Sequence, residues 1–284
     1  MPIKDILSDL RGYDLNPQGA TLYIGSSPVD KILVGSDAAY YGLVTTNLKI
    51  RIDAQNNVSY SGSGTTITDL QGNHNATLAG TFNNTTPKNW ELNKEAGSSV
   101  EFITFGDIET FNAAQDFTFS IWFEFTSLGE AGVGDGIVDH DIFSKGAHNT
   151  GQPLLVWYDK AVGGGTDSGN SQTISFMVTD EGGHQHWIAA PNDSIQENQI
   201  YNLVVQHNTD GRARIWINGV EKRDHTYTST DGMKNNTDPL KIGAPNTGGQ
   251  DSDMKVYAFH AYDSFLTDTQ IDQNWNHLKD RFGL

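Results

Sequence analysis

Residues 200–222 read IYNLVVQHNTDGRARIWINGVEK, and this stretch decides the fold. Apolar and polar residues alternate in 201–207 and again in 212–218, and the sequence Asn-Thr-Asp-Gly separates the two runs. Alternation with a period of two is typical of β-strands and Asp-Gly is a common hairpin turn, so the two runs predict a β-hairpin. Asn218-Gly219 supplies the next turn, and we expect a third strand to begin near Val220.

The second arm of this hairpin has two chemically different faces, because successive side chains of a strand point to opposite sides. Ala213, Ile215 and Ile217 share one face, which we expect to pack in a core. The opposite face carries Arg212, Arg214, Trp216 and Asn218.

Further alternating runs follow the same rule along the chain. They predict strands at 47–53, 99–105, 117–125, 141–145, 154–158, 173–179, 184–189 and 254–262. In the run 117–125, one face consists of Phe117, Phe119, Ile121, Phe123 and Phe125, which predicts a core-facing side. The sequence does not decide whether the other face, with Thr118, Ser120, Trp122 and Glu124, reaches solvent. A helix is predicted at 267–282, where Thr267 and Gln270 form a capping box.

The charge balance excludes several classes of partner. The 284 residues include 18 basic and 35 acidic side chains, which give a net charge of −17. Nucleic acids and anionic membrane surfaces are bound by clustered Lys and Arg, which this sequence lacks. The sequence contains no run of about 18 apolar residues, the length that crosses a membrane as a helix. Residues 1–12 lack the basic-then-apolar pattern of a secretion signal. We therefore expect synthesis in the cytoplasm.

Composition also limits the chemistry of any metal site. The sequence has no cysteine, so disulfides and thiolate metal ligands are excluded, and ions held by oxygen ligands remain. Thirty glycines, 10% aromatic residues and few helical patterns are typical of a turn-rich, all-β domain.

Two segments resemble laminin G-like and concanavalin A-like lectin domains. The hairpin matches a late hairpin of those domains through Tyr201, residues 203–205 and residues 215–219, with Tyr201 in place of the usual Trp. Residues 259–271 resemble the end of the same domains. The resemblance implies an all-β fold: a concanavalin A-like (laminin G-like) β-sandwich jelly roll with a C-terminal helix and a short N-terminal β module. We expect a docking and assembly module at 1–46 and the sandwich at 47–284.

Residues 22–42, LYIGSSPVDKILVGSDAAYYG, resemble a short module of tailed-phage structural proteins. The matching residues are Tyr23, Gly25, Val29, Lys31, Ile32, Gly35 and Tyr40. The resemblance implies that they serve assembly, whereas a plain β-hairpin packed on the main domain would explain the same pattern.

Residues 59–80, SYSGSGTTITDLQGNHNATLAG, resemble a segment of phage-encoded laminin G-like proteins. Ile67 stands where that segment has Trp, and Gln71 stands where it has Ser. The matching positions are Asp53-Ala54, Ser59-Tyr60, residues 62–65, Asp69-Leu70, Gly72-Asn73, Asn75 and Leu78.

Acidic loops offer a candidate calcium site. Lectin-like jelly rolls often bind this ion through carboxylate and carbonyl oxygens, and the resemblance implies the same role here for Asp135, Asp139, Asp141, Asp251 and Asp253. Their spacing matches no defined calcium loop, and Tyr257 stands where the family often has Asp. Solvated acidic loops are therefore the alternative, and no other cofactor is expected.

Two further patterns are candidate catalytic or metal sites. His184-Gln185-His186 places two imidazoles on one side of a strand, where they could share a transition metal, although two exposed histidines explain the same pattern. The alternating carboxylates of a glucanase are absent, since Asp107-Ile108-Glu109 comes nearest and lacks a third acid. No Gly-x-Ser-x-Gly elbow occurs either, so we expect no enzymatic activity.

Aromatic residues beside Asn- and Asp-rich loops indicate sugar binding without catalysis. We expect the side chains in question to be exposed and to stack on a glycan: Trp157, Tyr158, Trp187 and Trp216. The same aromatics could instead face a neighbouring subunit or simply cover the sheet.

The phage resemblances together predict a non-enzymatic virion structural protein of a tailed phage, acting as a capsid decoration, head-fibre or appendage component. In this interpretation residues 1–46 dock on other virion proteins of the capsid or tail, and the sandwich faces outward. The virion is assembled in the host bacterial cytoplasm. The alternative is a carbohydrate-binding lectin that recognises host-surface or environmental glycans. The sequence allows a homo-oligomer and shows no sign of three-fold symmetry.

Overall fold

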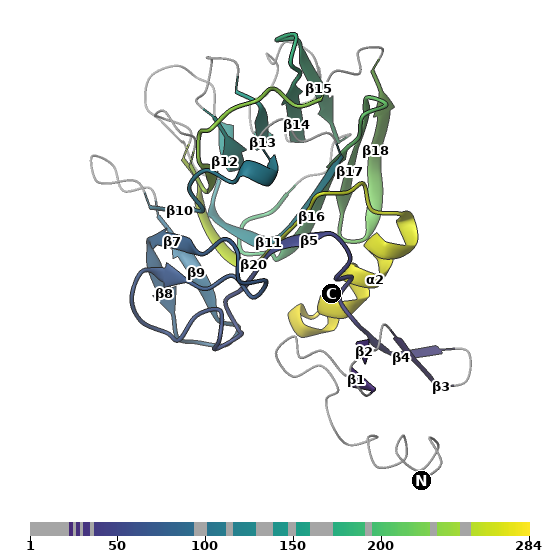
Figure 1. Ribbon diagram of the computed structural model, residues 1–284. Coiled ribbons are helices and arrows are strands. Elements are labelled where there is room, and N and C mark those ends of the chain that lie inside the picture. Colours follow the sequence, from purple (N-terminus) through teal and green to yellow (C-terminus); the bar gives the residue numbers. More distant parts are fainter. Residues whose placement is uncertain are drawn as a thin grey trace. The chain divides into compact units, whose positions relative to one another are not determined.

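The computed structural model describes most of the chain from residue 42 onward (Figure 1). The described residues are 42–93, 101–111, 116–128, 139–146, 152–159, 173–190, 195–227, 232–244 and 251–284. Four short strands before residue 42 are described by their backbone. The chain divides into two compact units: Asn47–Leu266 is one, and Met1–Thr46 with Thr267–Leu284 is the other.

The larger unit contains two antiparallel sheets, each with eight described strands (Figure 1). The first sheet has the order β15 (Gln185–Ala189), β14 (Thr173–Thr179), β13 (Leu154–Asp159), β12 (Asp139–Lys145), β19 (Leu240–Ile242), β10 (Phe102–Thr104), β7 (Ala76–Ala79) and β6 (Thr66–Ile67). The second has the order β18 (Val220–Thr226), β17 (Arg212–Ile217), β16 (Tyr201–His207), β11 (Phe117–Ser127), β20 (Asp253–Tyr262), β9 (Asn89–Leu92) and β8 (Thr81–Asn83), and β5 (Leu48–Asp53) also pairs with β20.

The predicted hairpin and its third strand are confirmed. β16 and β17 pair with Leu203 opposite Ile217 and His207 opposite Ala213. At the second turn Asn218 and Gly219 both have positive φ angles, +50° and +73°, as a type I′ turn requires. β18 begins directly after this turn. Type I′ turns are favoured in hairpins because their geometry suits the right-handed twist of paired strands.

β11 lies at the centre of the second sheet and supplies much of the core. Its five predicted core residues are fully buried, and the inward residues of β17 belong to the same cluster. The rings interlock: Phe119 lies 4.9 Å from Phe111 and 5.6 Å from Phe143, measured between ring centroids. Since each buried Phe contributes about 1.5–3 kcal/mol, this strand alone accounts for a large part of the hydrophobic stabilisation.

The opposite face of β11 is also buried, and at Thr118 the segment that follows β20 lies against it. The Thr118 hydroxyl donates to the Ser264 carbonyl at 2.7 Å and accepts from the Leu266 N–H at 3.1 Å. Gln206 on β16 donates to the same hydroxyl at 3.1 Å. These three hydrogen bonds satisfy the Thr118 hydroxyl, which this coverage removes from water.

Glu124, near the end of β11, accepts two hydrogen bonds on this face. The Tyr257 hydroxyl donates at 2.8 Å and the Lys255 ammonium donates at 2.5 Å. Burial, the hydrogen bond to Glu124 and the charges of nearby carboxylates all raise the pKa of the Tyr257 hydroxyl. Tyr257 therefore serves as a buried donor at the position where the related domains often have an acid.

The segment 59–80 folds around the buried carboxylate of Asp69. Its Oδ1 accepts the N–H groups of Arg51 and Gln71, and its Oδ2 accepts those of Asn73 and His74, at 2.8 to 3.1 Å. Gly72 has a φ of +84°, which lets the chain turn between these donors. The Gly- and Ser-rich run is thus an ordered turn rather than a linker.

Ser59, Tyr60 and Asn75 are also hydrogen-bonded within this segment. Ser59 Oγ donates to the Thr68 carbonyl, the Tyr60 hydroxyl donates to the Gly64 carbonyl, and Asn75 Oδ1 accepts the Asp69 N–H. These residues of the phage-like pattern therefore have structural roles.

The smaller unit contains α2 (Asp268–Leu278), which continues as a 3-10 helix, Lys279–Phe282. The predicted capping box of Thr267 and Gln270 is confirmed. Asn274 accepts the Val44 N–H at 2.9 Å and Gln273 donates to the Gly42 carbonyl at 2.8 Å, so the helix binds the end of the N-terminal segment. That segment contains two strand pairs: β1 (Tyr23–Ile24) with β2 (Ser27–Pro28), and β3 (Lys31–Val34) with β4 (Asp37–Tyr41). Among the described residues no helix is long and apolar enough to span a membrane.

Candidate functional site

The outer face of β13, β14 and β15 carries two of the predicted aromatic residues. Trp157 on β13 and Trp187 on β15 flank β14, where Ser175 lies opposite Trp157 and Met177 lies opposite Trp187. The two indoles meet at right angles with their centroids 5.2 Å apart. Trp157 is buried with Leu155 and Met177, whereas Trp187 is 41% exposed.

This arrangement holds the exposed indole in place. An edge-to-face aromatic pair contributes about 0.5–1.5 kcal/mol beyond the area that it buries. Because Trp157 is packed among Leu155 and Met177, it provides a fixed support for Trp187. Among the Phe, Tyr and Trp side chains that the structure describes, Trp187 is the one that is exposed, and Trp157 braces it.

The prediction that Tyr158 is exposed is wrong. Tyr158 follows Trp157 directly in β13 and so points to the opposite, inner face of the sheet. Its ring lies in the core, 5.8 Å from that of Phe125, and burial raises the pKa of its hydroxyl. The strand alternation separates these two neighbours, so they cannot share a binding face.

Trp157 and Trp216 are also more buried than predicted, and Trp216 belongs to the other sheet. Trp157 is covered by its own apolar neighbours on the outer face of the first sheet. Trp216 lies on β17, where the guanidinium of Arg214 sits 4.5 Å from its ring centroid. The four predicted glycan-binding residues therefore form no single cluster.

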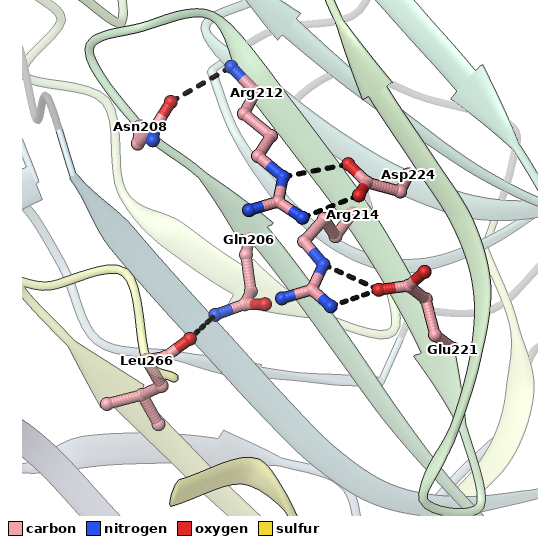
Figure 2. Close-up of polar contacts among 7 residues, drawn as sticks. All are labelled: Gln206, Asn208, Arg212, Arg214, Glu221, Asp224 and Leu266. Carbon is pink, nitrogen blue, oxygen red and sulfur yellow. Dashed lines mark hydrogen bonds and ion pairs between the residues drawn. The ribbon is translucent and has the colours of Figure 1, made fainter. Parts of the chain in front are cut away.

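The outer face of the β16–β18 hairpin is fastened by two arginines, which Figure 2 shows with their acidic partners on β18. Arg212 binds both carboxylate oxygens of Asp224, at 2.9 and 2.6 Å. Arg214 donates from Nε and Nη2 to one oxygen of Glu221. These pairs tie β17 to β18 across the sheet, and the charges that they use are matched within the hairpin.

Gln206 links the same face to the segment after β20 (Figure 2). Its Nε2 donates to the Leu266 carbonyl at 2.9 Å. Phe265, the residue before, lies within 6 Å of the guanidinium groups of both Arg212 (5.7 Å) and Arg214 (5.9 Å). This polar cluster is consistent with a structural role.

The predicted calcium ligands are only partly described. Asp135 lies outside the described residues, and so does the side chain of Asp139. Asp141 is buried on β12, with its carbonyl accepting a hydrogen bond from Ser252 Oγ at 2.7 Å, and Asp251 is buried beside that serine. Asp253 begins β20. Within the described residues no group of three or more acidic, His or Cys side chains could hold a metal ion, and calcium binding stays a prediction.

The histidine pair meets a residue that the sequence analysis missed. Nδ1 of His184 and Nε2 of His186 lie 3.2 and 3.0 Å from the same oxygen of Asp180, a buried acid at the end of β14. Asp180 also accepts the His184 N–H through its other oxygen, at 2.8 Å, and so closes the turn between β14 and β15. The sequence DEGGH did carry a signal, since an acid before a Gly-Gly turn often accepts hydrogen bonds from the residues that follow.

The carboxylates nearest to a glucanase pattern do not form a free pair. Asp107 Oδ1 lies 3.3 Å from Nζ of Lys145, a lysine with a fully buried side chain, and Glu109 starts a short 3-10 helix. Burial lowers the pKa of Lys145, and the hydrogen bond and charge of Asp107 act against that shift. Asp107 therefore neutralises a buried cation.

The predicted assembly residues are described only in part. Tyr23, Lys31, Ile32 and Tyr40 lie on β1, β3 and β4, whose backbone is described. Gly25, Val29 and Gly35 lie outside the described residues. Their role in assembly stays a prediction.

Residues 97–272, more than half of the chain, match the family model laminin G 3, whose description is "Concanavalin A-like lectin/glucanases superfamily". The chain belongs to this superfamily. Membership explains the two packed antiparallel sheets, and it confirms the fold that the hairpin and the chain end predict. No curated protein sequence matches the chain.

Solved structures with the same fold include binding domains of botulinum neurotoxins. The binding domain of type DC in complex with rat synaptotagmin II is 14% identical to this chain, with a TM-score of 0.60. The alignment covers 82% of this chain and 52% of the solved chain. A type C structure reaches 15% and 0.59, with 82% and 51% aligned, and the serotype G binding domain reaches 16% and 0.54, with 80% and 50%. The chain thus spans about half the length of these structures, and likeness at such identities concerns the fold.

Proposed function

We propose that the sandwich is a non-enzymatic carbohydrate-binding module whose binding face is the outer side of β13, β14 and β15. The observation that carries the proposal is the exposed indole of Trp187, braced edge-on by Trp157. An exposed, immobilised aromatic ring is what the apolar face of a sugar stacks on, and little side-chain entropy is lost when it binds.

The wider family supports this proposal. The superfamily is described by lectins and glucanases, and one solved structure with the same fold carries a title that links cell entry of botulinum neurotoxin type C to two ganglioside molecules. Another is described in complex with SialylT. The ion pair of Asp107 with Lys145 supports the non-enzymatic part, since this acid is engaged where a hydrolase would need it free.

The test is a glycan array followed by calorimetry on the best ligand, with wild type and two matched variants. Trp187→Ala removes the exposed ring and should weaken saturable binding, whereas Val220→Ala removes an exposed apolar side chain of the other sheet, 55% exposed, and should leave binding unchanged. Loss of one stacked ring corresponds to about 1–2 kcal/mol, a 5- to 30-fold weaker association. Unchanged binding by Trp187→Ala would refute this assignment of the face.

A second candidate function is that of a virion structural protein of a tailed phage, located on the virion as a capsid decoration, head-fibre or appendage component. The sequence pattern of residues 22–42 supports it, and so do the two strand pairs β1–β2 and β3–β4 in the same segment. In this role the N-terminal segment binds capsid or tail proteins and the sandwich presents its glycan-binding face.

The virion role is tested by binding to particles that lack the protein. Because the carbonyl of Gly42 and the N–H of Val44 bind α2, the truncated chain should begin at Gly42 so that the helix keeps these partners. We expect the full chain to decorate particles and the truncated chain to be lost from them. Full decoration by the truncated chain would contradict a docking role for this segment.

A further inference from the structure

Strand β15 forms one edge of the first sheet, and among the strands that the structure describes it is hydrogen-bonded to β14 alone. The Asp180 N–H donates to the His184 carbonyl and the Ala190 N–H donates to the Ile174 carbonyl, both at 2.9 Å. Hydrogen bonds of an antiparallel pair alternate along each strand, so the even-numbered residues of β15 direct their N–H and C=O groups to β14. The odd-numbered residues, Gln185, Trp187 and Ala189, direct theirs outward.

Within its five residues, β15 has no charged acid or base, no proline and no bulge to protect the sheet edge from pairing. Exposed edges are usually blocked by charged side chains, proline or bulges. β15, with the sequence QHWIA, has no carboxylate, lysine, arginine or proline, and its register with β14 is regular. The edge of the second sheet differs, because β18 has Glu221, Lys222, Arg223 and Asp224 in succession and a register shift against β17.

We propose that a second copy of this chain pairs with β15 in antiparallel orientation, about a two-fold axis at Trp187. In this register Trp187 lies opposite the same residue of the second copy, and Gln185 lies opposite Ala189. Each of the three outward-directed residues then donates one N–H and accepts with one C=O, so every outward group of the strand is used. The first sheets of the two copies become one continuous sheet.

The charge pattern favours a second copy at β15 and disfavours one at β18. A chain with a net charge of −17 can pair with itself only where few acids face each other, and the five residues of β15 include none. Along β18, a two-fold axis at Lys222, Arg223 or Asp224 would place a charge opposite its own copy. The two edges are therefore distinguished by their sequences.

The pairing also affects the exposed indole. Residues directly opposite in an antiparallel pair have Cβ atoms about 4.5–5.5 Å apart, so the two Trp187 side chains would stand beside each other on the outer face. The face that we propose for glycan binding would then extend over both copies. The pairing itself needs no glycan and stands on the edge geometry alone.

The experiment is size-exclusion chromatography with light scattering on the full chain, over roughly 1–100 µM, a range that brackets micromolar association. Wild type is expected to approach twice 31.1 kDa as the concentration rises. Ala189→Pro removes an N–H group that is directed outward and leaves the hydrogen bonds to β14 intact. This variant should therefore be a monomer with an unchanged melting temperature. The matched control is Thr226→Pro, because the Tyr227 N–H donates to the Gly211 carbonyl and residue 226 is therefore directed outward at the β18 edge. This variant should remain a dimer.

A second variant does not depend on proline. Trp187→Lys places an ammonium opposite its own copy and should also give a monomer. A monomeric wild type over the whole range, or a dimer that survives in both Ala189→Pro and Trp187→Lys, would overturn the proposal. Since Ala189→Pro keeps the indole, glycan binding measured on this monomer separates failure of the pairing from failure of the proposed function.

Discussion

Replacement of Asp69 should show how strongly one carboxylate fastens the turn at 69–74. The side chain is buried and accepts four backbone N–H groups, two on each oxygen. In Asp69→Asn one oxygen becomes an NH₂ group that faces two donors, so two of the four bonds are lost. A hydrogen bond to a charged group contributes about 1.5–3 kcal/mol, and part of this is recovered where water reaches the exposed N–H groups. We expect Asp69→Asn to lower the free energy of unfolding by roughly 2–4 kcal/mol.

Asp69→Ala removes all four bonds and leaves the buried Arg51 N–H without its acceptor, so it should cost more, roughly 4–5 kcal/mol. Urea unfolding followed by tryptophan fluorescence measures both values, since Trp90 is fully buried and reports on the sandwich. The control is Asp210→Asn, an exposed acid in the hairpin turn, which should change stability by less than about 0.5 kcal/mol. Equal stability of Asp69→Asn and Asp210→Asn would refute the role assigned to this carboxylate.

Substitutions at three other positions test the hairpin and the buried ion pair. The hydrogen bond from Arg212 lowers the pKa of Asp224 below its ordinary value of 3.8, so the stabilisation is present above that value and lost as the pH falls through the lowered pKa. Asp224→Asn should therefore lower the urea midpoint at about pH 7 and lose less stability than wild type on going to about pH 2, and identical pH profiles would contradict this. Gly219→Ala adds a Cβ to a residue with a φ of +73° and should lower the free energy of unfolding by about 1–2 kcal/mol. We expect the melting temperature to fall by roughly 2–8 °C. An unchanged melting temperature would argue against the turn geometry. The Lys145 ammonium lies 2.6 Å from the Asp238 carbonyl and 3.3 Å from Asp107, and Lys145→Ala removes it. This variant should lower the free energy of unfolding in urea by about 3–5 kcal/mol, which is more than Lys145→Met, because methionine fills the same space. Equal losses in the two variants would show that packing at this site is unimportant.

Local signals in the sequence were sufficient for the long strands and the hairpin. In β16 and β17 the alternation, the Asp-Gly turn and the Asn-Gly turn all indicate the same geometry, and each is set by residues close in the chain. β7, β9 and β19 were not predicted, because strands of three or four residues are too short for alternation to be recognised. Their position depends on pairing with distant strands, as β19 does with β10 and β12.

The candidate site was less predictable, because exposure depends on tertiary packing. Trp157 and Trp187 lie near each other in space, but nothing local in the sequence indicates that Trp157 is buried by Met177 and Leu155. Tyr158 was an avoidable error, since the alternation that predicts β13 also places it on the inner face. Asp180 lies four residues before His184, and its effect on both imidazoles appears only when the turn is formed.

The turn around Asp69 has a consequence for sequence diversity. Gln71, Asn73 and His74 contribute main-chain N–H groups to it, so the chain path there is specified by one acid and one glycine with positive φ. Side chains at these three positions can therefore diverge among homologues, or be randomised in a library, while the loop keeps its conformation. This makes the segment a suitable place to install a new recognition surface on the sandwich.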